Sequence, residues 1–200
     1  MISSSDLIFL FFTVGLIAFL LVVRIIVVKV HRRAWSALGE STGLAFTPGN
    51  FFGRGMSLSG EYRSYPLTLE FFNFRSGRTS STYTHILLPL RAGRDLSFWL
   101  TSETVFSKIA KAAGKNDFQT GDDALDRRFT IRGNPQAGVA RLLSSPGLRQ
   151  MLLDAPSLQV RLEEGQIDLL KQGVLTNPTT LVYLLDLAVA LAAAVESARG

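Results

Sequence analysis

Three aspartates close together are the residues best suited to chemistry in this sequence. They lie in the segment TGDDALDRRF, as Asp122, Asp123 and Asp126. Clustered carboxylates can coordinate a hard cation or act as an acid and base pair, but the alternating oxygen ligands and terminal Glu of a calcium loop are missing. The pattern instead favours a turn with an N-cap at Asp122 or Asp123. Arg127 and Arg128 are then the expected ion-pair partners.

The sequence contains no thiol and few of the side chains that usually bind metals. The chain has 200 residues, no Cys and only two His, His31 and His85. These counts exclude disulfides, thiolate zinc sites, Cys nucleophiles and multi-His metal centres. His31 lies among basic residues that follow an apolar segment, so we expect it at a membrane interface. His85 falls on an expected strand, which predicts a hydrogen-bonded sheet residue rather than a ligand.

The common catalytic motifs are also missing from the sequence. GMSLSG is the closest stretch to a G-x-S-x-G nucleophile elbow, and it lacks the second Gly in place. No phosphate-binding loop precedes Gly114-Lys115, and FFGRGMS does not fit a dinucleotide fingerprint. We therefore expect a protein that is not an enzyme, with no cofactor and no metal.

A long apolar segment opens the chain. Residues 7–23 contain nothing more polar than Thr13, and after Arg24 the apolar run continues to Val28. These 22 residues would make a helix of about 33 Å, enough to cross a hydrocarbon core of ~30 Å. The start, MISSSD, has no Lys or Arg, unlike the basic start of a signal peptide. The segment is therefore expected to stay as a membrane anchor.

The charges that flank this anchor predict its orientation. Four basic residues lie at its C-terminal end, namely Arg24, Lys29, Arg32 and Arg33. Because basic residues favour the cytoplasmic side, we expect the N-terminus outside and residues 34–200 in the cytoplasm of a bacterium, at its inner membrane. The expected division is an anchor with its basic flank, residues 1–33, and a cytoplasmic domain, residues 34–200. The basic flank is expected to meet lipid headgroups.

The expected domain is nearly neutral. The chain has 21 basic and 16 acidic residues, and removing the four flanking basic residues and Asp6 leaves 17 − 15 = +2 for residues 34–200. A nucleic-acid binder needs a concentrated basic stripe. Arg75 and Arg78, with Arg91 and Arg94 nearby, lie in turn-like segments and do not form one. We expect no nucleic-acid partner.

The first half of the domain has the pattern of an antiparallel meander. After a short helix that begins near Trp35, four runs are rich in β-branched, aromatic or alternating residues: Met56–Tyr62, 67–74, 82–90 and 96–101. The linking segments RSYP, RSGRTSS and RAGRD carry turn residues, and such short links favour hairpins.

The second half mixes helices with two or three strands. We expect a helix over 104–114, a strand over 128–131 and a hairpin turned at Glu164-Gly165. Helices should begin at Asn134-Pro135, Ser145-Pro146 and Asn177-Pro178, because a capping side chain before proline is a helix start signal.

The last helix, residues 179–195, is apolar enough to be confused with a second membrane span. Asp186 lies near its middle, and a central carboxylate costs ~2.5 to 3.5 kcal/mol on insertion. A helix packed on a sheet, with Asp186 toward solvent or a partner, is the better interpretation. The predicted fold class is therefore α+β: one N-terminal transmembrane helix followed by a mainly antiparallel sheet covered by several helices.

Two motifs follow the anchor. One is W-x-x-L-x-x-x-x-G-L-x-F, carried by Trp35, Leu38, Gly43, Leu44 and Phe46, and the other is T-G-D-x-x-[FL]-D-x-x-F, at residues 120–129 with Leu125 where Phe is usual. With the NP helix start and the closing hairpin and helix, residues 34–195 resemble uncharacterised bacterial single-pass membrane proteins. The resemblance implies this architecture and no activity.

Two functions remain open. The first is a non-enzymatic accessory or scaffold subunit that stabilises a larger inner-membrane complex, respiratory or photosynthetic. Its topology resembles the subunit that caps the cytoplasmic side of purple-type photosynthetic reaction centres. The second is a membrane-tethered sensor or ligand-binding module. For the first, the residues expected to contact lipids or neighbouring membrane subunits, besides the basic flank, are Gly15, Ala18, Phe51, Phe52, Arg75 and Arg78.

Overall fold

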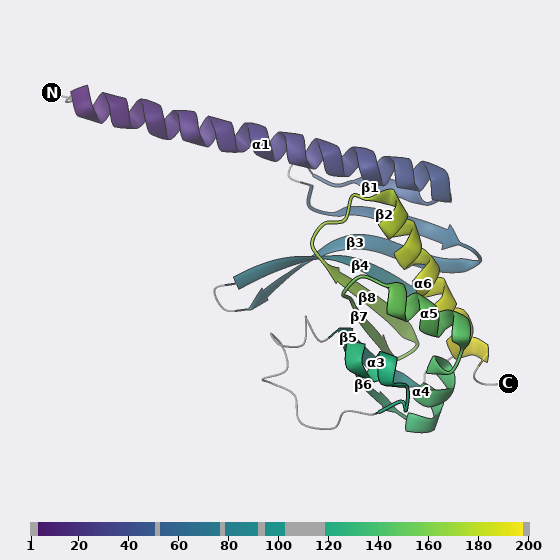
Figure 1. Ribbon diagram of the computed structural model, residues 1–200. Helices are drawn as coiled ribbons and strands as arrows, with labels where there is room; N and C mark the ends of the chain where they lie inside the picture. Colours follow the sequence, from purple (N-terminus) through teal and green to yellow (C-terminus); the bar gives the residue numbers. More distant parts are fainter. Residues whose placement is uncertain (1–3, 51–52, 77–78, 92–94, 103–118, 198–200) are drawn as a thin grey trace.

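The predicted fold class is confirmed by the computed structural model, which describes residues 4–50, 53–76, 79–91, 95–102 and 119–197. Within these residues a long N-terminal helix precedes an eight-stranded antiparallel sheet, with helices packed on it (Figure 1). The helices are α1 (Ser4–Thr42), α3 (Asp123–Arg128), α4 (Gln136–Leu143), α5 (Pro146–Asp154) and α6 (Pro178–Ser197).

The strands are joined in the order β1-β2-β3-β4-β8-β7-β5-β6. Their bounds are β1 (Ala45–Pro48), β2 (Met56–Tyr62), β3 (Tyr65–Ser76), β4 (Thr79–Pro89), β5 (Ser97–Ser102), β6 (Phe129–Asn134), β7 (Gln159–Glu163) and β8 (Gln166–Gln172). The predicted strands exist, and the β7-β8 hairpin turns at Glu164-Gly165, both with positive φ. The predicted meander of four consecutive strands is wrong at its last step, because β5 does not pair with β4.

That error concerns the neighbours of β4 and β5. The β7-β8 hairpin lies between these two strands, so β4 pairs with β8 and β5 pairs with β7 and β6. In the β4-β8 ladder Ile86 lies opposite Leu169, and both are fully buried. By pairing with β4, the β7-β8 hairpin places Leu169 beside Ile86 in the core. The burial of such pairs outweighs the short connection that favoured a pairing of β4 with β5.

α1 is one continuous helix of 39 residues, about 58 Å long. The separate short helix expected from Trp35 onward is therefore wrong as a separate element, because no Pro interrupts the helix before it ends at Thr42. The first half of α1 extends away from the domain, whereas its last turns lie along β1 and β2 (Figure 1). The expected boundary between residues 33 and 34 falls inside this helix, and that division stays a prediction.

The last turns of α1 are part of the core. Trp35 is 0% exposed, its ring centre lies 4.1 Å from that of Phe71, and its indole Nε1 donates to the Leu175 carbonyl over 2.9 Å. Gly39 is needed for this close approach, because a Cβ there would lie 2.8 Å from the Leu44 carbonyl oxygen. The direction of α1 relative to the sheet is fixed by these contacts.

α6 is a core helix, as expected, and lies across β4 and β8 (Figure 1). By length and composition alone both α1 and α6 could cross a membrane. The side chains of α6 expected to face the core, however, are fully buried, namely Leu181, Leu184, Leu185, Ala188 and Leu191. Asp186 does not point to solvent alone: the Tyr62 hydroxyl donates to it over 2.7 Å and Arg63 pairs with it at 3.0 Å.

Two of the three expected helix starts are confirmed. Ser145 precedes α5 with Pro146 in its first turn, and Asn177 accepts from the Thr180 backbone N–H over 3.1 Å at the start of α6. Asn134 is not an N-cap: it ends β6, opposite Ser97, and Pro135 takes the cap position of α4. The helix expected over 104–114 lies outside the described residues.

Candidate functional site

The aspartate cluster is a structural cap. Asp122 is the N-cap of α3 and accepts from the backbone N–H groups of Ala124 and Leu125 over 2.9 and 3.3 Å. Its ion-pair partner is Arg149 of α5, with Nη2 3.0 Å from Oδ1. The hydrogen bond from Arg149, together with those backbone donors, lowers the pKa of the Asp122 carboxyl to about 2.

The other members of the cluster point to separate partners. Asp126 accepts from Thr120 and from the Gly121 N–H, at 2.8 to 3.2 Å. The expected pairing of Arg127 and Arg128 with these carboxylates is wrong, because both guanidinium groups donate to backbone carbonyls, those of Asp123 and Ala155. Among the described residues no group of three His, Asp or Glu side chains is placed to hold a metal ion.

The residues expected to contact lipid or partners lie mainly along α1. Gly15, Ala18, Arg24, Lys29 and Arg33 are exposed, and a Cβ at Gly15 would meet nothing within 4 Å. Arg32 differs from the rest of the basic flank. Its guanidinium Nη2 donates to the Asn50 carbonyl over 2.6 Å, so this side chain holds the loop after β1 against the helix.

The remaining contact predictions concern residues outside α1, together with His31 at the expected membrane interface. Phe51, Phe52 and Arg78 lie outside the described residues, and Arg75 lies in β3 opposite Ser80 of β4. His31 is half-buried, with its ring 6.2 Å from that of Phe71. Their contacts with lipid or partners stay predictions.

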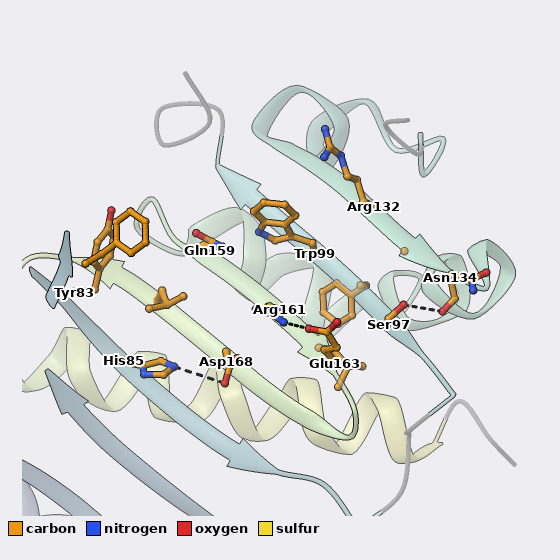
Figure 2. Close-up of a pocket in the computed structure, with 15 residues that line it drawn as sticks. Tyr83, His85, Ser97, Trp99, Arg132, Asn134, Gln159, Arg161, Glu163 and Asp168 are labelled. Carbon is orange, nitrogen blue, oxygen red and sulfur yellow. Dashed lines mark hydrogen bonds and ion pairs between the residues drawn. The ribbon is translucent and has the colours of Figure 1, made fainter. Parts of the chain in front are cut away.

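A cavity of about 820 Å³ lies on the sheet face opposite to α6, which we call the outer face (Figure 2). Residues of six strands line it, because side chains at alternate positions of neighbouring strands point to the same face. Three of them stand in one row across the sheet: Asp168 of β8 is opposite Arg161 of β7, which is opposite Trp99 of β5. Arg132 of β6 continues the row.

His85 lies between two carboxylates beside this row. Its Nδ1 is 3.5 Å from Glu70 Oε1, and its Nε2 is 3.6 Å from Asp168 Oδ1. The expected position of His85 on a strand is confirmed, and both of its ring nitrogens have a carboxylate as neighbour. Burial raises the pKa of the Asp168 carboxyl, but hydrogen bonds from His85 and Gln166 outweigh that effect, so its pKa lies below the usual value.

The far side of the cavity combines an aromatic ring with charges. The Arg132 guanidinium lies over the Trp99 ring, 5.8 Å from its centre. Arg161 and Glu163 form an ion pair (Figure 2). The Trp99 indole Nε1 is buried, and within the described part of the chain it has no hydrogen-bond partner.

Of the residues that line this cavity, His85 could be singled out from the sequence, whereas its neighbours across the sheet were not predicted. Trp99, Arg132, Arg161 and Asp168 lie on four strands, and only Arg161 and Asp168, on the two strands of the β7-β8 hairpin, are close in sequence. The available signal was the alternation of polar and apolar residues in segments such as QVRLE and QIDLL. That alternation predicts a polar face of a sheet, but it cannot indicate which strands are neighbours.

The fold and the cavity define a class: an α+β domain with a single antiparallel sheet, joined to an N-terminal helix that is long and apolar enough to cross a membrane. No protein-family model and no curated protein matches the chain. It is similar to the crystal structure of the mycobacterial trehalose monomycolate transport factor A, TtfA, with 13% identity over 82% of this chain and 93% of that chain, and a TM-score of 0.52. At this identity the likeness shows a shared fold and nothing more.

These comparisons bear on the functional expectations in one respect. Neither the fold nor its solved relative supports a respiratory or photosynthetic complex as the host. The resemblance to uncharacterised bacterial single-pass membrane proteins stays a prediction.

Proposed function

We propose that this chain is a non-enzymatic accessory subunit of a transport assembly in the bacterial inner membrane, where it acts by contact. The observation that carries the proposal is the division of α1 into two halves. Its first half leaves large apolar side chains exposed, with Phe9, Phe11 and Phe12 each more than 70% exposed. Such a surface needs lipid or other apolar helices around it.

The second half of α1 supports the proposal by fixing the domain to the anchor. Trp35 and Leu38 are buried in the core, Val28 is buried next to Gly53, and Arg32 holds the loop after β1. The domain therefore cannot swing freely on a linker. A subunit that braces its neighbours needs such a rigid connection, whereas a tethered enzyme does not.

The solved relative supports the choice of a transport assembly. TtfA is named a transport factor for trehalose monomycolate. An accessory role in transport fits a chain whose long apolar helix is packed directly on its sheet. The N-terminus is then outside and residues 34–200 are in the cytoplasm, as the basic flank favours.

Extraction in mild detergent, native separation and mass spectrometry test the proposal. The full chain with a C-terminal tag should migrate with other membrane proteins. A matched variant, in which residues 4–27 are replaced by an unrelated single-span helix, should stay in the membrane but lose these partners. If the native chain migrates alone, the proposal is wrong.

A membrane-tethered ligand-binding module is the second candidate, and the cavity of about 820 Å³ favours it. Its size lies within the ~300 to 1,000 Å³ of small-molecule sites. Deletion of the gene separates the two functions. Loss of the parent assembly supports the accessory subunit, whereas an intact assembly with altered ligand response supports the module.

A further inference from the structure

The β3-β4 hairpin continues beyond its neighbours in the sheet. β2 pairs with β3 only as far as Glu70, and β8 pairs with β4 only from Tyr83 onward. Beyond these positions the two strands pair with each other, and no other strand of the described chain pairs with them. We call this two-stranded extension, residues 71–76 and 79–82, the hairpin end.

The hairpin end points toward the apolar half of α1. A Cβ at Gly39 of α1 would lie 2.9 Å from Leu58 Cδ2, and Leu58 of β2 pairs with Leu69 of β3. Further along β3, the Phe71 ring centre lies 4.1 Å from that of Trp35, one helical turn nearer the start of α1. β3 therefore runs alongside α1 toward its first half, and the hairpin extends on that side of the sheet (Figure 1).

The hairpin end reaches the level at which the apolar segment of α1 ends. A strand rises ~3.3 Å per residue, so Phe74 lies about 10 Å beyond Phe71. In a helix this length corresponds to about seven residues, counted back from Trp35. Phe74 is therefore level with Val28, where the apolar run of the sequence ends. Val28 is itself buried next to Gly53, so the surface of the domain already begins at this level.

Phe74 is an exposed apolar side chain at this level. It is 50% exposed, and among the described residues every other exposed large apolar side chain belongs to α1. Phe71 faces α1, and side chains alternate along a strand, so Phe74 faces away from the core. Aromatic rings favour the interface between lipid and water in membrane proteins. An exposed ring beside the end of a membrane span fits that position.

The sequence and the free strand edges of the hairpin end fit a headgroup layer. From residue 71 to residue 94 the sequence has no Asp or Glu, and Arg75 follows Phe74 directly. Basic residues near a membrane are attracted to anionic lipids. Unpaired N–H and C=O groups at a strand edge need water, which the headgroup layer provides and the hydrocarbon core does not. The contact is therefore a shallow one.

From these features we infer that the hairpin end is a second membrane contact, which lies in the headgroup layer of the bilayer that α1 crosses, with Phe74 as its apolar anchor. The membrane then holds the domain at two points, and the second point fixes its rotation about the axis of α1. The inference rests on the proposed function for the position of α1 in the membrane. It requires neither a partner subunit nor a particular orientation of the chain.

Fluorescence quenching by nitroxide lipids tests the inference. The chain has no Cys, so Ser80→Cys, on the exposed surface of the hairpin end, provides one labelling site that leaves Phe74 in place. The full chain carries a nitrobenzoxadiazole dye at this site. It is reconstituted alone in vesicles of phosphatidylcholine and phosphatidylglycerol that contain a nitroxide either on the headgroup or in the acyl chain.

Two reference sites calibrate the quenching. Val22→Cys lies in the exposed apolar half of α1, and its label should be quenched by the acyl-chain nitroxide. Ser197→Cys lies at the exposed end of α6. Its neighbour Glu196 accepts from the Tyr65 hydroxyl at the opposite end of β3, so a label at Ser197 should be quenched by neither nitroxide.

The label at Ser80 should be quenched by the headgroup nitroxide roughly fivefold more than the label at Ser197. Adding Phe74→Ala to the labelled chain should lower this quenching roughly fivefold, because the apolar anchor is lost. Phe74→Trp is the matched control and should keep the quenching, since Trp also favours the interface. An unchanged melting temperature shows that neither variant has unfolded the domain.

Three results would overturn the inference. They are a Ser80 label quenched no more than the Ser197 label, quenching that Phe74→Ala does not reduce, and a Ser80 label that is shielded in native membranes but not in vesicles, which would indicate a protein partner. A Val22 label that the acyl-chain nitroxide does not quench would overturn the position of α1 and the inference with it. A chain that migrates alone on native gels but shows the expected quenching refutes the accessory-subunit proposal and leaves the hairpin contact standing.

Discussion

Asp122 joins two helices that are far apart in sequence. It caps α3 and pairs with Arg149 of α5. The cap could be predicted from the T-G-D pattern, since Asp is a preferred N-cap residue. Arg149 could not, because it lies 27 residues away and meets Asp122 only through the packing of α3 against α5. The adjacent Arg127 and Arg128 were the obvious partners, but their side chains bond to the backbone instead.

Stability at low pH should depend on this pair. The pKa of Asp122 is about 2 in the folded chain, below its ordinary value of 3.8. A lowered folded pKa means that the contribution is present above pH ~4 and is lost as the pH falls toward 2. Asp122→Asn should therefore lower the free energy of unfolding at pH 7 and flatten its decline between pH 4 and 2. Urea unfolding at each pH measures both effects.

The exposed neighbour Asp123 provides the control for this substitution. Asp123→Asn keeps the cap and the Arg149 pair, so its stability should follow the native chain over the same pH range. Equal pH dependence in the native chain and in Asp122→Asn would contradict the account.

At the scale of elements, the local patterns predicted most strands and the core helix α6. Alternation, turn residues and capping signals act over a few neighbouring residues, so they can be recognised directly. The order of strands could not be predicted in the same way. The place of the β7-β8 hairpin between β4 and β5 depends on pairs such as Ile86 with Leu169, which are distant in sequence. The continuity of α1 was missed because a separate helix was expected to begin near Trp35, although no Pro interrupts the chain there.

Gly39 should be the position where α1 is most sensitive to added volume. A Cβ there would lie 2.8 Å from the Leu44 carbonyl oxygen and 2.9 Å from Leu58 Cδ2. Gly39→Ala should therefore destabilise the domain by about 1 to 3 kcal/mol through overpacking. Chemical unfolding in detergent, followed by tryptophan fluorescence, measures the loss.

Gly15→Ala provides the matched helical control. A Cβ at Gly15 meets nothing within 4 Å, so this variant should unfold like the native chain. If Gly39→Ala is equally neutral, the last turns of α1 do not pack on the sheet as described.

At the scale of the whole molecule, we propose that residues 34–200 lie in the cytoplasm, because the basic residues that follow the anchor favour that side of the membrane. A protease added outside intact cells should therefore leave residues 34–200 uncut, and the same protease should cut them after the membrane is opened. Immunoblotting of a C-terminal tag measures both states. Cleavage in intact cells would place the domain outside and reverse the orientation.

Gly15 and Ala18 form the small-residue patch through which α1 is proposed to contact its partners. Gly15 and Ala18 lie on one face of α1 because they are three residues apart, and both are small and exposed. Close helix packing in membranes uses such small residues. Ile17 lies on another face of the same helix, so Ile17→Phe adds volume without filling the patch.

The most direct test is the size of the assembly that carries each variant on native gels after mild extraction. The account predicts that the native chain and Ile17→Phe migrate in the same large assembly. Gly15→Leu combined with Ala18→Leu should migrate mainly alone, with the melting temperature of the domain unchanged. Migration of the native chain alone, or of all three chains in the same assembly, would contradict the claim that this protein acts through contacts of α1.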